Sequence, residues 1–251
     1  MPEFKLKNFD LQLCAVTLPD NPDTSSATVG KDYLLYVNGG TASIPVWKIV
    51  GGQRSSNLNR SADSVDLSHK TSGGWKTTKQ GLKGWGIDLD AIILLEETGY
   101  EEGVAIIEAG YMQGKDINIK LVYPNGLYRT GWTQVTDFPE EAPHDGEASL
   151  SGTLEGVGAL SNLLPDLTPI TATMSLAAAA DKVFTILPAT TTVSSVKNGS
   201  TAITVTTDYT YSTGTLTLLS GYLDGLTAGA YTFTVTTGDG ATLTVTVTIT
   251  A

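Results

Sequence analysis

The sequence has a single cysteine, Cys14, so neither an intrachain disulfide nor a thiolate metal cluster can form. It has no long hydrophobic run: apolar stretches such as residues 91–95 are far too short to cross a bilayer. Basic residues are scarce, since 15 Lys and Arg accompany 26 Asp and Glu, for a net charge of −11. This charge disfavours binding to the phosphate backbone of nucleic acids, whereas an acidic wall repels DNA and lets it slide past without sticking.

The first residues, Met1–Lys5, are not followed by the apolar segment of a secretory signal peptide. We therefore expect the protein to be made and folded in the cytoplasm. Cys14 is expected to be a small apolar side chain that is buried or half-buried.

Patterns of catalytic residues are also missing. The two histidines, His69 and His144, lie in polar segments, and nothing in the sequence places either near a nucleophile. There is no H-x-x-x-H, C-x-x-C or Asp-rich calcium loop, and residues 51–56 lack the Lys-Ser/Thr ending of a phosphate loop. We therefore expect no metal, no cofactor and no enzymatic activity.

Adjacent carboxylates could serve glycoside hydrolysis, but the clearest pairs fit structural roles better. Glu101 and Glu102 suit the first turn of a helix, where acids are stabilised by the helix dipole. Glu140 and Glu141 precede Ala-Pro and suit an exposed loop. Neither pair is a candidate catalytic site.

The composition changes near residue 167. All four Trp and both His lie before this point, and only six charged residues follow it, in a chain that becomes rich in Thr. Residues 163–169 contain two prolines and have the character of a linker. The sequence therefore predicts two domains, residues 1–166 and 167–251.

Polar and apolar residues alternate clearly in the second domain. Threonines and apolar residues follow each other without a break through residues 242–250, which predicts a strand with one buried face. Gly238–Gly240 is a tight turn between this strand and the preceding one. About seven short strands in this half favour an immunoglobulin-like β-sandwich.

The first domain is predicted to be mostly β with one helix. Strands are expected at residues 4–17, 46–50, 85–91 and 148–155, and Pro124–Gly126 predicts a hairpin between residues 116–123 and 127–135. Thr98 and Glu101 form a capping-box pattern that predicts a helix over residues 99–112.

A long polar segment, residues 55–75, lies between two of these strands. Loops longer than about 12–15 residues are uncommon in compact domains and are usually functional or disordered. The segment ends in Trp75 beside two glycines, and an apolar anchor on such a loop suits the pocket of a partner. Trp85 and Trp132 lie in predicted strands, so core packing is their expected role.

Several motifs in the first 160 residues together resemble the major tail protein of long, non-contractile-tailed bacteriophages. They are Val46-Trp47-Lys48, Gly51–Asp63, Ser68–Lys76, Gly81–Ala91, Tyr123–Tyr128 and Glu141–Gly156. The resemblance implies two packed β-sheets with a flanking helix. It also implies rings of six copies, stacked into a tube through which DNA leaves the capsid.

In that family the long loop reaches a neighbouring ring, so the resemblance implies such a role for about residues 52–80. The matching positions are Arg54, Leu58, Asn59, Asp63, Lys70 and Trp75. The implied partners are further copies of the chain, the tape measure protein and other tail proteins. The resemblance also implies that DNA is present only in transit, that no membrane is a partner, and that the protein is located in the virion tail.

Asp88 and Asp90 lie on one side of an alternating strand, opposite Ile87 and Leu89. They are candidates for acids that face the lumen of the tube. The alternative is that they are ordinary acids that face solvent.

The second domain resembles the small immunoglobulin-like module of bacterial cellulose-degrading complexes. The resemblance is carried by residues 207–218, 221–229, 232–235 and 241–248. It implies a module on the outside of the tube that could weakly bind cell-surface glycans. Tyr209, Tyr211 and Tyr222 are candidate glycan contacts, with core and rim packing as the alternative.

The sequence therefore predicts a virion structural protein, the tail tube subunit, with an outer immunoglobulin-like decoration. The rival interpretation is a carbohydrate-binding cell-surface adhesion protein in which both domains serve binding.

Overall fold

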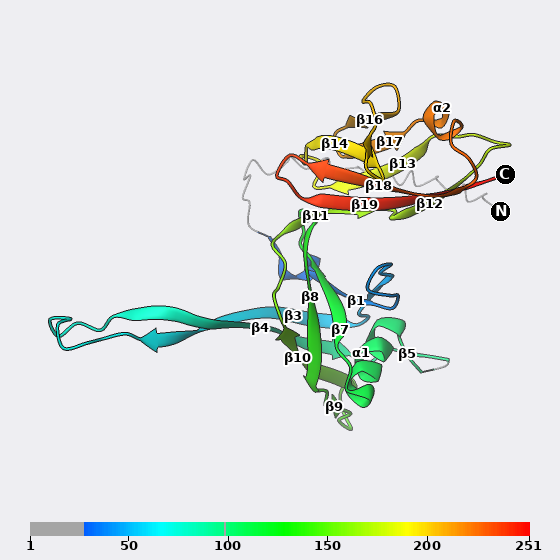
Figure 1. The fold of residues 1–251 in the computed structure, drawn as a ribbon. Helices are drawn as coiled ribbons and strands as arrows, with labels where there is room; N and C mark the ends of the chain where they lie inside the picture. Colours follow the sequence, from blue (N-terminus) through cyan, green and yellow to red (C-terminus); the bar gives the residue numbers. More distant parts are fainter. Residues whose placement is uncertain (1–27, 98) are drawn as a thin grey trace, which may run out of the picture.

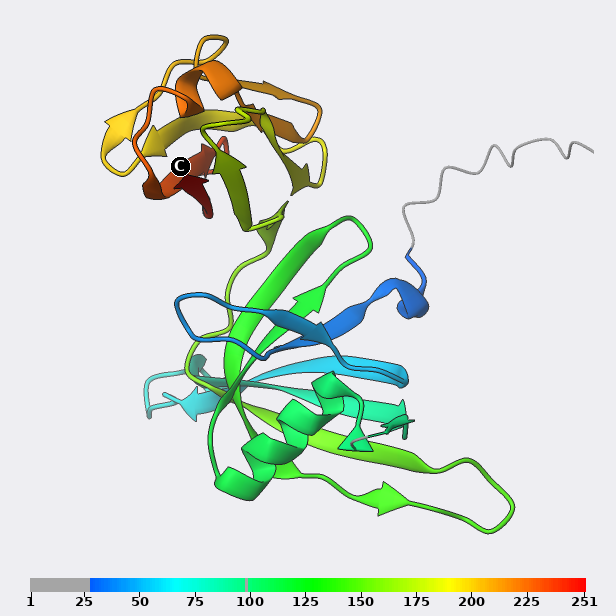
Figure 2. The same cartoon turned by 90° about the vertical axis from the view of Figure 1, so that its right-hand side faces the viewer.

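The computed structural model describes residues 28–97 and 99–251, and it has two bodies, each with its own core (Figures 1 and 2). The strand expected at residues 4–17, together with Cys14 and Thr98, lies outside the described residues. The prediction of a mainly β protein with one helix beside the first sheet and a C-terminal β-sandwich is confirmed.

The first body is built around one antiparallel sheet, in the order β2-β1-β7-β8-β10-β4-β3. Its elements are the 3-10 turn η1 (Gly30–Asp32), β1 (Leu34–Asn38), β2 (Trp47–Ile49), β3 (Gln53–Asp66), β4 (Thr78–Ile92), β5 (Leu95–Glu96), β6 (Gly99–Tyr100), α1 (Glu102–Gln113), β7 (Ile117–Val122), β8 (Leu127–Asp137), β9 (Glu140–Glu141) and β10 (Ser149–Val157).

The body's core lies between this sheet and α1. In β4 the alternation buries Ile87 and Leu89, as predicted, and these join a cluster with Val104 and Ile107 of α1. Among the residues that the structure describes, no helix packs on the opposite face of β4, which presents the polar side chains of Asp88 and Asp90. In this part of the chain α1 therefore covers one face of the sheet, and the other face is polar.

Helix α1 starts three residues later than the capping box predicts. Glu101 is the N-cap residue, and its carboxylate accepts hydrogen bonds from the backbone N–H groups of Val104 and Gly51, at 3.4 and 2.8 Å. Gly99 and Tyr100 instead pair with β5 as a short hairpin. The helix ends at Gln113, and the C-cap residue that follows, Gly114, has a φ of 59°, which suits glycine.

The largest difference from the sequence-based expectation is the polar segment 55–75, most of which is strand. Strands β3 and β4 pair from Gln53 opposite Ala91 to Asp66 opposite Thr78, so that only residues 67–77 form the tip. Figure 1 shows this hairpin projecting far from the body. Both faces of the projecting part are exposed, so its sequence has no apolar alternation that would reveal a strand.

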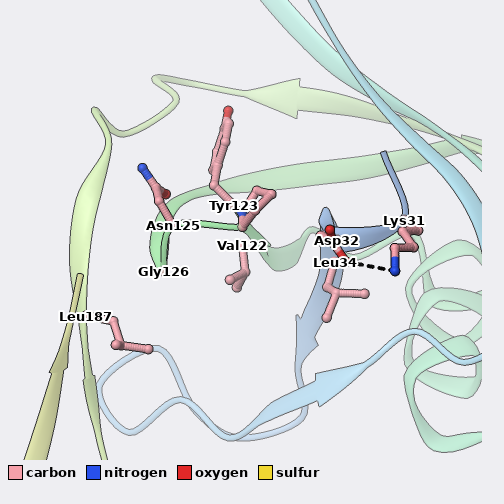
Figure 3. A pocket seen from close by; sticks show the side chains of 9 residues that line it. Lys31, Asp32, Leu34, Val122, Tyr123, Asn125, Gly126 and Leu187 are labelled. Atoms are coloured by element: carbon pink, nitrogen blue, oxygen red, sulfur yellow. Dashed lines mark ion pairs between the residues drawn. The ribbon is translucent and has the colours of Figure 1, made fainter. Parts of the chain in front are cut away.

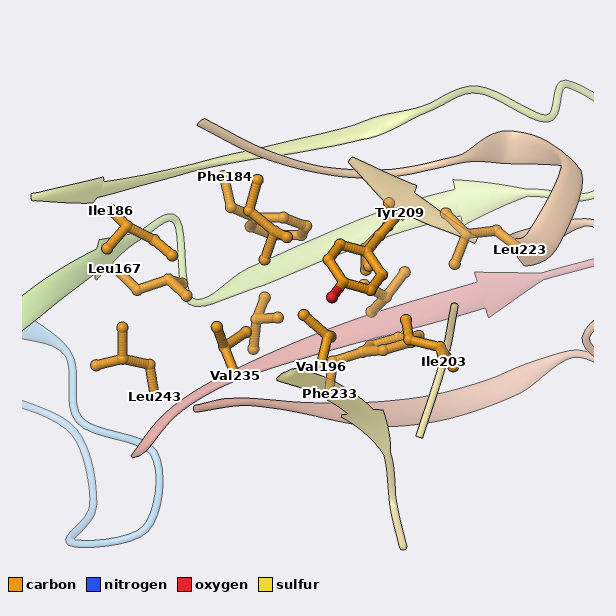
Figure 4. Packing of buried hydrophobic residues seen from close by; sticks show 14 of the residues in the cluster. Leu167, Phe184, Ile186, Val196, Ile203, Tyr209, Leu223, Phe233, Val235 and Leu243 are labelled. Carbon is orange, nitrogen blue, oxygen red and sulfur yellow. The ribbon is translucent and has the colours of Figure 1, made fainter. Parts of the chain in front are cut away.

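The second body is a sandwich of two sheets, and its elements continue the chain order. They are β11 (Leu164–Thr168), β12 (Thr171–Ser175), β13 (Lys182–Leu187), β14 (Val193–Asn198), β15 (Thr201–Ala202), β16 (Tyr209–Ser212), β17 (Thr215–Leu218), α2 (Ser220–Leu223), β18 (Gly229–Thr237) and β19 (Thr242–Thr250). One layer has the order β16-β17-β13-β11 and the other β12-β19-β18-β14-β15. Figure 4 shows the core between them, in which Phe184 and Phe233 are fully buried.

The two bodies share β11, so the expectation of a linker at residues 163–169 is wrong in one respect. Leu164 and Pro165 pair with β8, and Asp166–Thr168 pair with β13. The first layer of the sandwich is thereby continuous with the sheet of the first body. The segment is extended, which suits the residues that precede Pro165 and Pro169, but its backbone is hydrogen-bonded on both sides of the junction.

A nearly buried ion pair lies at this junction. The Lys120 ammonium is 2.6 Å from the Asp166 carboxylate and 4.4 Å from the centroid of the Tyr128 ring. Burial raises the pKa of the Tyr128 hydroxyl to about 12, and the nearby Asp166 charge adds to this shift. Lys120 is 7% exposed, so little water reaches its ammonium group, and the Asp166 carboxylate and the Tyr128 ring stabilise it in place of water.

Candidate functional site

The residues predicted to contact a neighbouring ring fall into two groups along the β3–β4 hairpin. Leu58 and Asn59 lie where the hairpin emerges from the body, and Leu58 packs against the core. Arg54 lies deeper still, at a β-bulge, and forms an ion pair with Glu147. The Arg54 guanidinium also donates a hydrogen bond to the Glu147 carboxylate, and this bond is the main reason why the pKa of Arg54 is raised.

The other group projects beyond the body. Asp63 lies on β3, Lys70 and Trp75 lie at the tip, and all three are exposed. Trp75 is 82% exposed. The structure therefore does not bring the six predicted residues together in one chain, and only the second group extends away from its own subunit.

The tip is held by its own hydrogen bonds. The Ser68 side chain and, to a smaller degree, the Ser68 N–H lower the pKa of Asp66, and the N–H donates to the Asp66 carboxylate at 2.8 Å. The Ser68 hydroxyl accepts from the Thr77 N–H at 2.9 Å, closing the tip across its base. His69 contacts Thr71 of the same tip, which is a structural role.

Asp88 and Asp90 lie on the polar face of the sheet, as predicted, with Asp88 exposed and Asp90 half-buried. Asn59 donates to the Asp88 carboxylate at 2.6 Å. Glu155 of β10 shares this face, because it lies opposite Gly86 of β4 and is exposed. Asp88, Glu155 and Asn59 line a shallow depression, and Asp90 lies beside it, two residues further along β4.

Glu155 was missed from the sequence. The signal was present, since Ser151, Thr153 and Glu155 alternate with buried Gly152 and Leu154 in the predicted strand. What the sequence does not contain is the register that places this strand beside β4.

The three candidate glycan-binding tyrosines lie in or against the core of the second body. Tyr209 is buried, and Tyr222 packs edge-to-face on Phe233 with ring centroids 6.3 Å apart. The hydroxyls of Tyr211 and Tyr222 are hydrogen-bonded to the Thr191 carbonyl and the Asn198 amide. The arrangement matches the core-packing alternative and does not form a stacking platform.

The tryptophans divide in a similar way. Trp85 is 8% exposed and donates its indole N–H to the Gly158 carbonyl at 3.0 Å, so its predicted core role is confirmed. Trp132 is 41% exposed, so the core role predicted for it is wrong. Its strand exposes every second residue, and Trp132 falls on the exposed side.

A cavity of about 480 Å³ lies at the junction of the two bodies (Figure 3). It is lined by the turn Tyr123–Gly126, by Leu34 and by Leu187 of the second body. Its two charged residues, Lys31 and Asp32, pair with each other at 4.0 Å. This lining contains no combination of nucleophile and base that would support catalysis.

Among the described residues, no group of three His, Cys, Asp or Glu side chains could hold a metal ion. Within the same residues, no helix is both long and apolar enough to cross a membrane. His144 lies in an exposed loop, where its ring is 3.5 Å from the Asp145 carboxylate.

Similarity to solved structures is distant. A chain in the virion of a native gene transfer agent particle is 21% identical, with 55% of this chain and 99% of that chain covered and a TM-score of 0.46. The SPP1 tail tube is 14% identical, with 53% and 77% covered and a TM-score of 0.44. A tri-modular GH5 endo-beta-1,4-glucanase from Bacillus licheniformis is 13% identical, with 66% and 35% covered and a TM-score of 0.32. No curated protein matches the chain.

Two family models match the chain. Residues 167–247 match the carbohydrate binding domain X2, and residues 27–162 match the phage tail tube protein. The match to the phage tail tube protein covers more than half of the chain. The chain therefore belongs to the phage tail tube protein family, whose members are structural components of the virion tail.

Proposed function

We propose that copies of this chain form rings of six that stack into the tail tube, through which DNA is delivered. The observation that carries this proposal is the sheet with two different faces. One face is closed by α1, and the other presents Asp88, Asp90 and Glu155. A wall of this kind, turned toward a lumen, repels DNA and does not retain it.

The edges of the sheet support ring formation. Within the part of the chain that the structure describes, β3 and β2 end the sheet and have no strand on their outer sides. A long unpaired edge such as β3 invites association, and closure into a ring removes it. The tape measure protein and other tail proteins are the further partners that we propose.

Negative-stain microscopy of the purified protein tests the proposal. We expect tubes or six-fold rings. Monomers that bind polysaccharide in a pull-down would contradict the proposal and favour the adhesion interpretation.

The lumen assignment has a test of its own. Asp88→Lys is expected to leave tubes intact but to make them retain short duplex DNA at low salt, because a lysine in each copy attracts phosphates. DNA that cosediments with the tubes should rise several-fold at about 50 mM salt and fall again at about 200 mM. Asp224→Lys makes the same charge change on the second body and serves as the control. Equal retention by the two variants would refute the lumen-facing position of Asp88.

We further propose that residues 1–166 are the tail tube domain and residues 167–251 an accessory domain on the outside. The two separate cores and the ends of the family matches support this division. A chain that ends at Asp166 keeps the Lys120 ion pair and the pairing of β11 with β8. We expect it to form tubes of reduced outer diameter by microscopy. Recovery of insoluble monomer alone would show that the division is wrong.

Carbohydrate binding is the second candidate function, and it concerns the accessory domain. The match of residues 167–247 to the carbohydrate binding domain X2 favours it. Since Tyr209 is buried and the other two tyrosines pack on the core, any glycan contact requires other surface residues. A polysaccharide pull-down with the whole chain and with the chain that ends at Asp166 tests whether carbohydrate binding depends on the accessory domain.

A further inference from the structure

The outer part of the β3–β4 hairpin, residues 60–83 with the tip at its end, is basic, although the protein is acidic. Five of the 15 Lys and Arg lie in residues 60–83, with two acids, so this segment carries 5 − 2 = +3 while the rest of the chain carries −11 − 3 = −14. The seven charged residues are all exposed: Arg60, Asp63, Asp66, Lys70, Lys76, Lys79 and Lys83. The ion pairs found among the described residues involve none of them.

The outer part of the hairpin also carries large apolar side chains that are exposed. Trp75 and Leu82 are each 82% exposed, and Val65 and Leu67 are 46% and 43% exposed. Large apolar groups on a projecting polar ribbon are typical of a contact surface, where a Trp often contributes most of the binding energy.

A complementary surface lies at the other end of the same ribbon. Strand β4 runs from the tip to Ile92, a distance of about 50 Å at about 3.4 Å per residue. The chain then enters the β5–β6 hairpin, where Leu94 and Leu95 are 45% and 72% exposed and Glu96 and Glu97 are exposed. Figure 1 shows β5 on the side of the body opposite the projecting hairpin.

This end is more acidic than its own sequence suggests. The Tyr100 hydroxyl of β6 donates to the Glu140 carboxylate, a bond that raises the pKa of Tyr100 to about 12. The contact brings β9, with exposed Glu140 and Glu141, next to the β5–β6 hairpin. The exposed leucines are thus accompanied by four glutamates, two from the β5–β6 hairpin and two from β9.

From this complementarity we propose that the hairpin tip of one copy docks on the β5–β6 end of a second copy, with Trp75 against the exposed leucines and the lysines against the glutamates. The proposal rests on the proposed stacking of rings and names the surface that receives the hairpin. The two surfaces lie at opposite ends of one ribbon, so they meet only between copies. A contact of this head-to-tail kind repeats without closing, which builds a stack.

Charge reversal tests the pairing. Lys76→Glu with Lys79→Glu, and separately Glu96→Lys with Glu97→Lys, are each expected to reduce sedimentable tubes by about tenfold or more at 0.1 M salt, because like charges then face each other across the contact. Combining the four changes should restore tubes. Lys115→Glu with Lys197→Glu makes the same charge change at exposed positions elsewhere and should leave assembly unchanged.

A disulfide measurement identifies the receiving surface independently of charge. In a Cys14→Ser background, Lys76→Cys with Glu96→Cys should give a ladder of covalent dimers, trimers and longer chains when tubes are mildly oxidised. Each cysteine alone should give at most dimers. Tubes without such a ladder, or normal tubes from both charge-reversed pairs, would overturn the proposed docking surface.

The outcomes separate this inference from the proposed function. Normal stacking by both reversed pairs, with tubes from the unaltered protein, would refute only the docking surface. The absence of any ring or tube from the unaltered protein would refute the tail tube function and this inference with it. Circular dichroism of each variant confirms that a lost tube is not a lost fold.

Discussion

Replacing residues 62–83 with an Asn-Gly turn is expected to abolish tube formation while the body of the protein stays folded. Ser61 and Gly84 are opposite each other in the β3–β4 register, and Asn-Gly closes an antiparallel pair with a two-residue turn. The excised segment contributes no residue to either core, so the free energy of unfolding should change by less than about 0.5 kcal/mol.

The measurement pairs two readouts on the same preparation. Sedimentation and negative-stain microscopy should find no tubes, while thermal unfolding followed by circular dichroism should match the unaltered protein. A cut that began at Ser55 would not be equivalent, since Ser55–Asn59 pair with the buried part of β4. Tubes of normal length from the shortened hairpin would refute its role in stacking.

Asp166→Ala is expected to destabilise the junction by about 3 kcal/mol, the low end of the range for removing one partner of a buried ion pair. The Lys120 charge would remain nearly buried, beside the faces of Tyr128 and Trp47. The value is at the low end because the Asp166 side chain is 23% exposed, so water can partly replace the carboxylate.

Urea unfolding followed by tryptophan fluorescence measures this effect, since all four Trp precede residue 167 and Trp47 lies 5.8 Å from the Lys120 ammonium. Lys120→Met with Asp166→Leu removes both charges and keeps most of the apolar volume, so it should be nearly neutral. If Asp166→Ala shifts stability by less than about 0.5 kcal/mol, the ion pair does not hold the junction.

The sequence predicts those strands that bury one face and expose the other. Residues 85–91 and the hairpin around Pro124–Gly126 appear where expected, because burial on one face imposes the period of two. The projecting part of β3 and β4 has no buried face, so its strand character leaves no periodic signal. The capping-box pattern of Thr98 and Glu101 predicts the helix correctly but not its first residue. Glu101 is itself the N-cap, and its carboxylate also accepts a hydrogen bond from the Gly51 N–H, fifty residues away in the chain.

The candidate site was predictable to a similar degree. Alternation alone placed Asp88 and Asp90 on the polar face, while Glu155 joined them only through the pairing of β10 with β4. The basic character of residues 60–83 is visible in the sequence. Its counterpart is not, because the Tyr100–Glu140 hydrogen bond that gathers the glutamates joins residues forty positions apart.

The strand common to both sheets, β11, has a mechanical consequence. In the tube that we propose, a flexible tether would let each accessory module tumble, and averaging over many copies would blur it. A backbone hydrogen-bonded to β8 and to β13 restrains the module instead, so regular stacking would place the modules in an ordered lattice at constant spacing. On a surface with repeating receptors, individually feeble contacts at such spacing would add up through avidity.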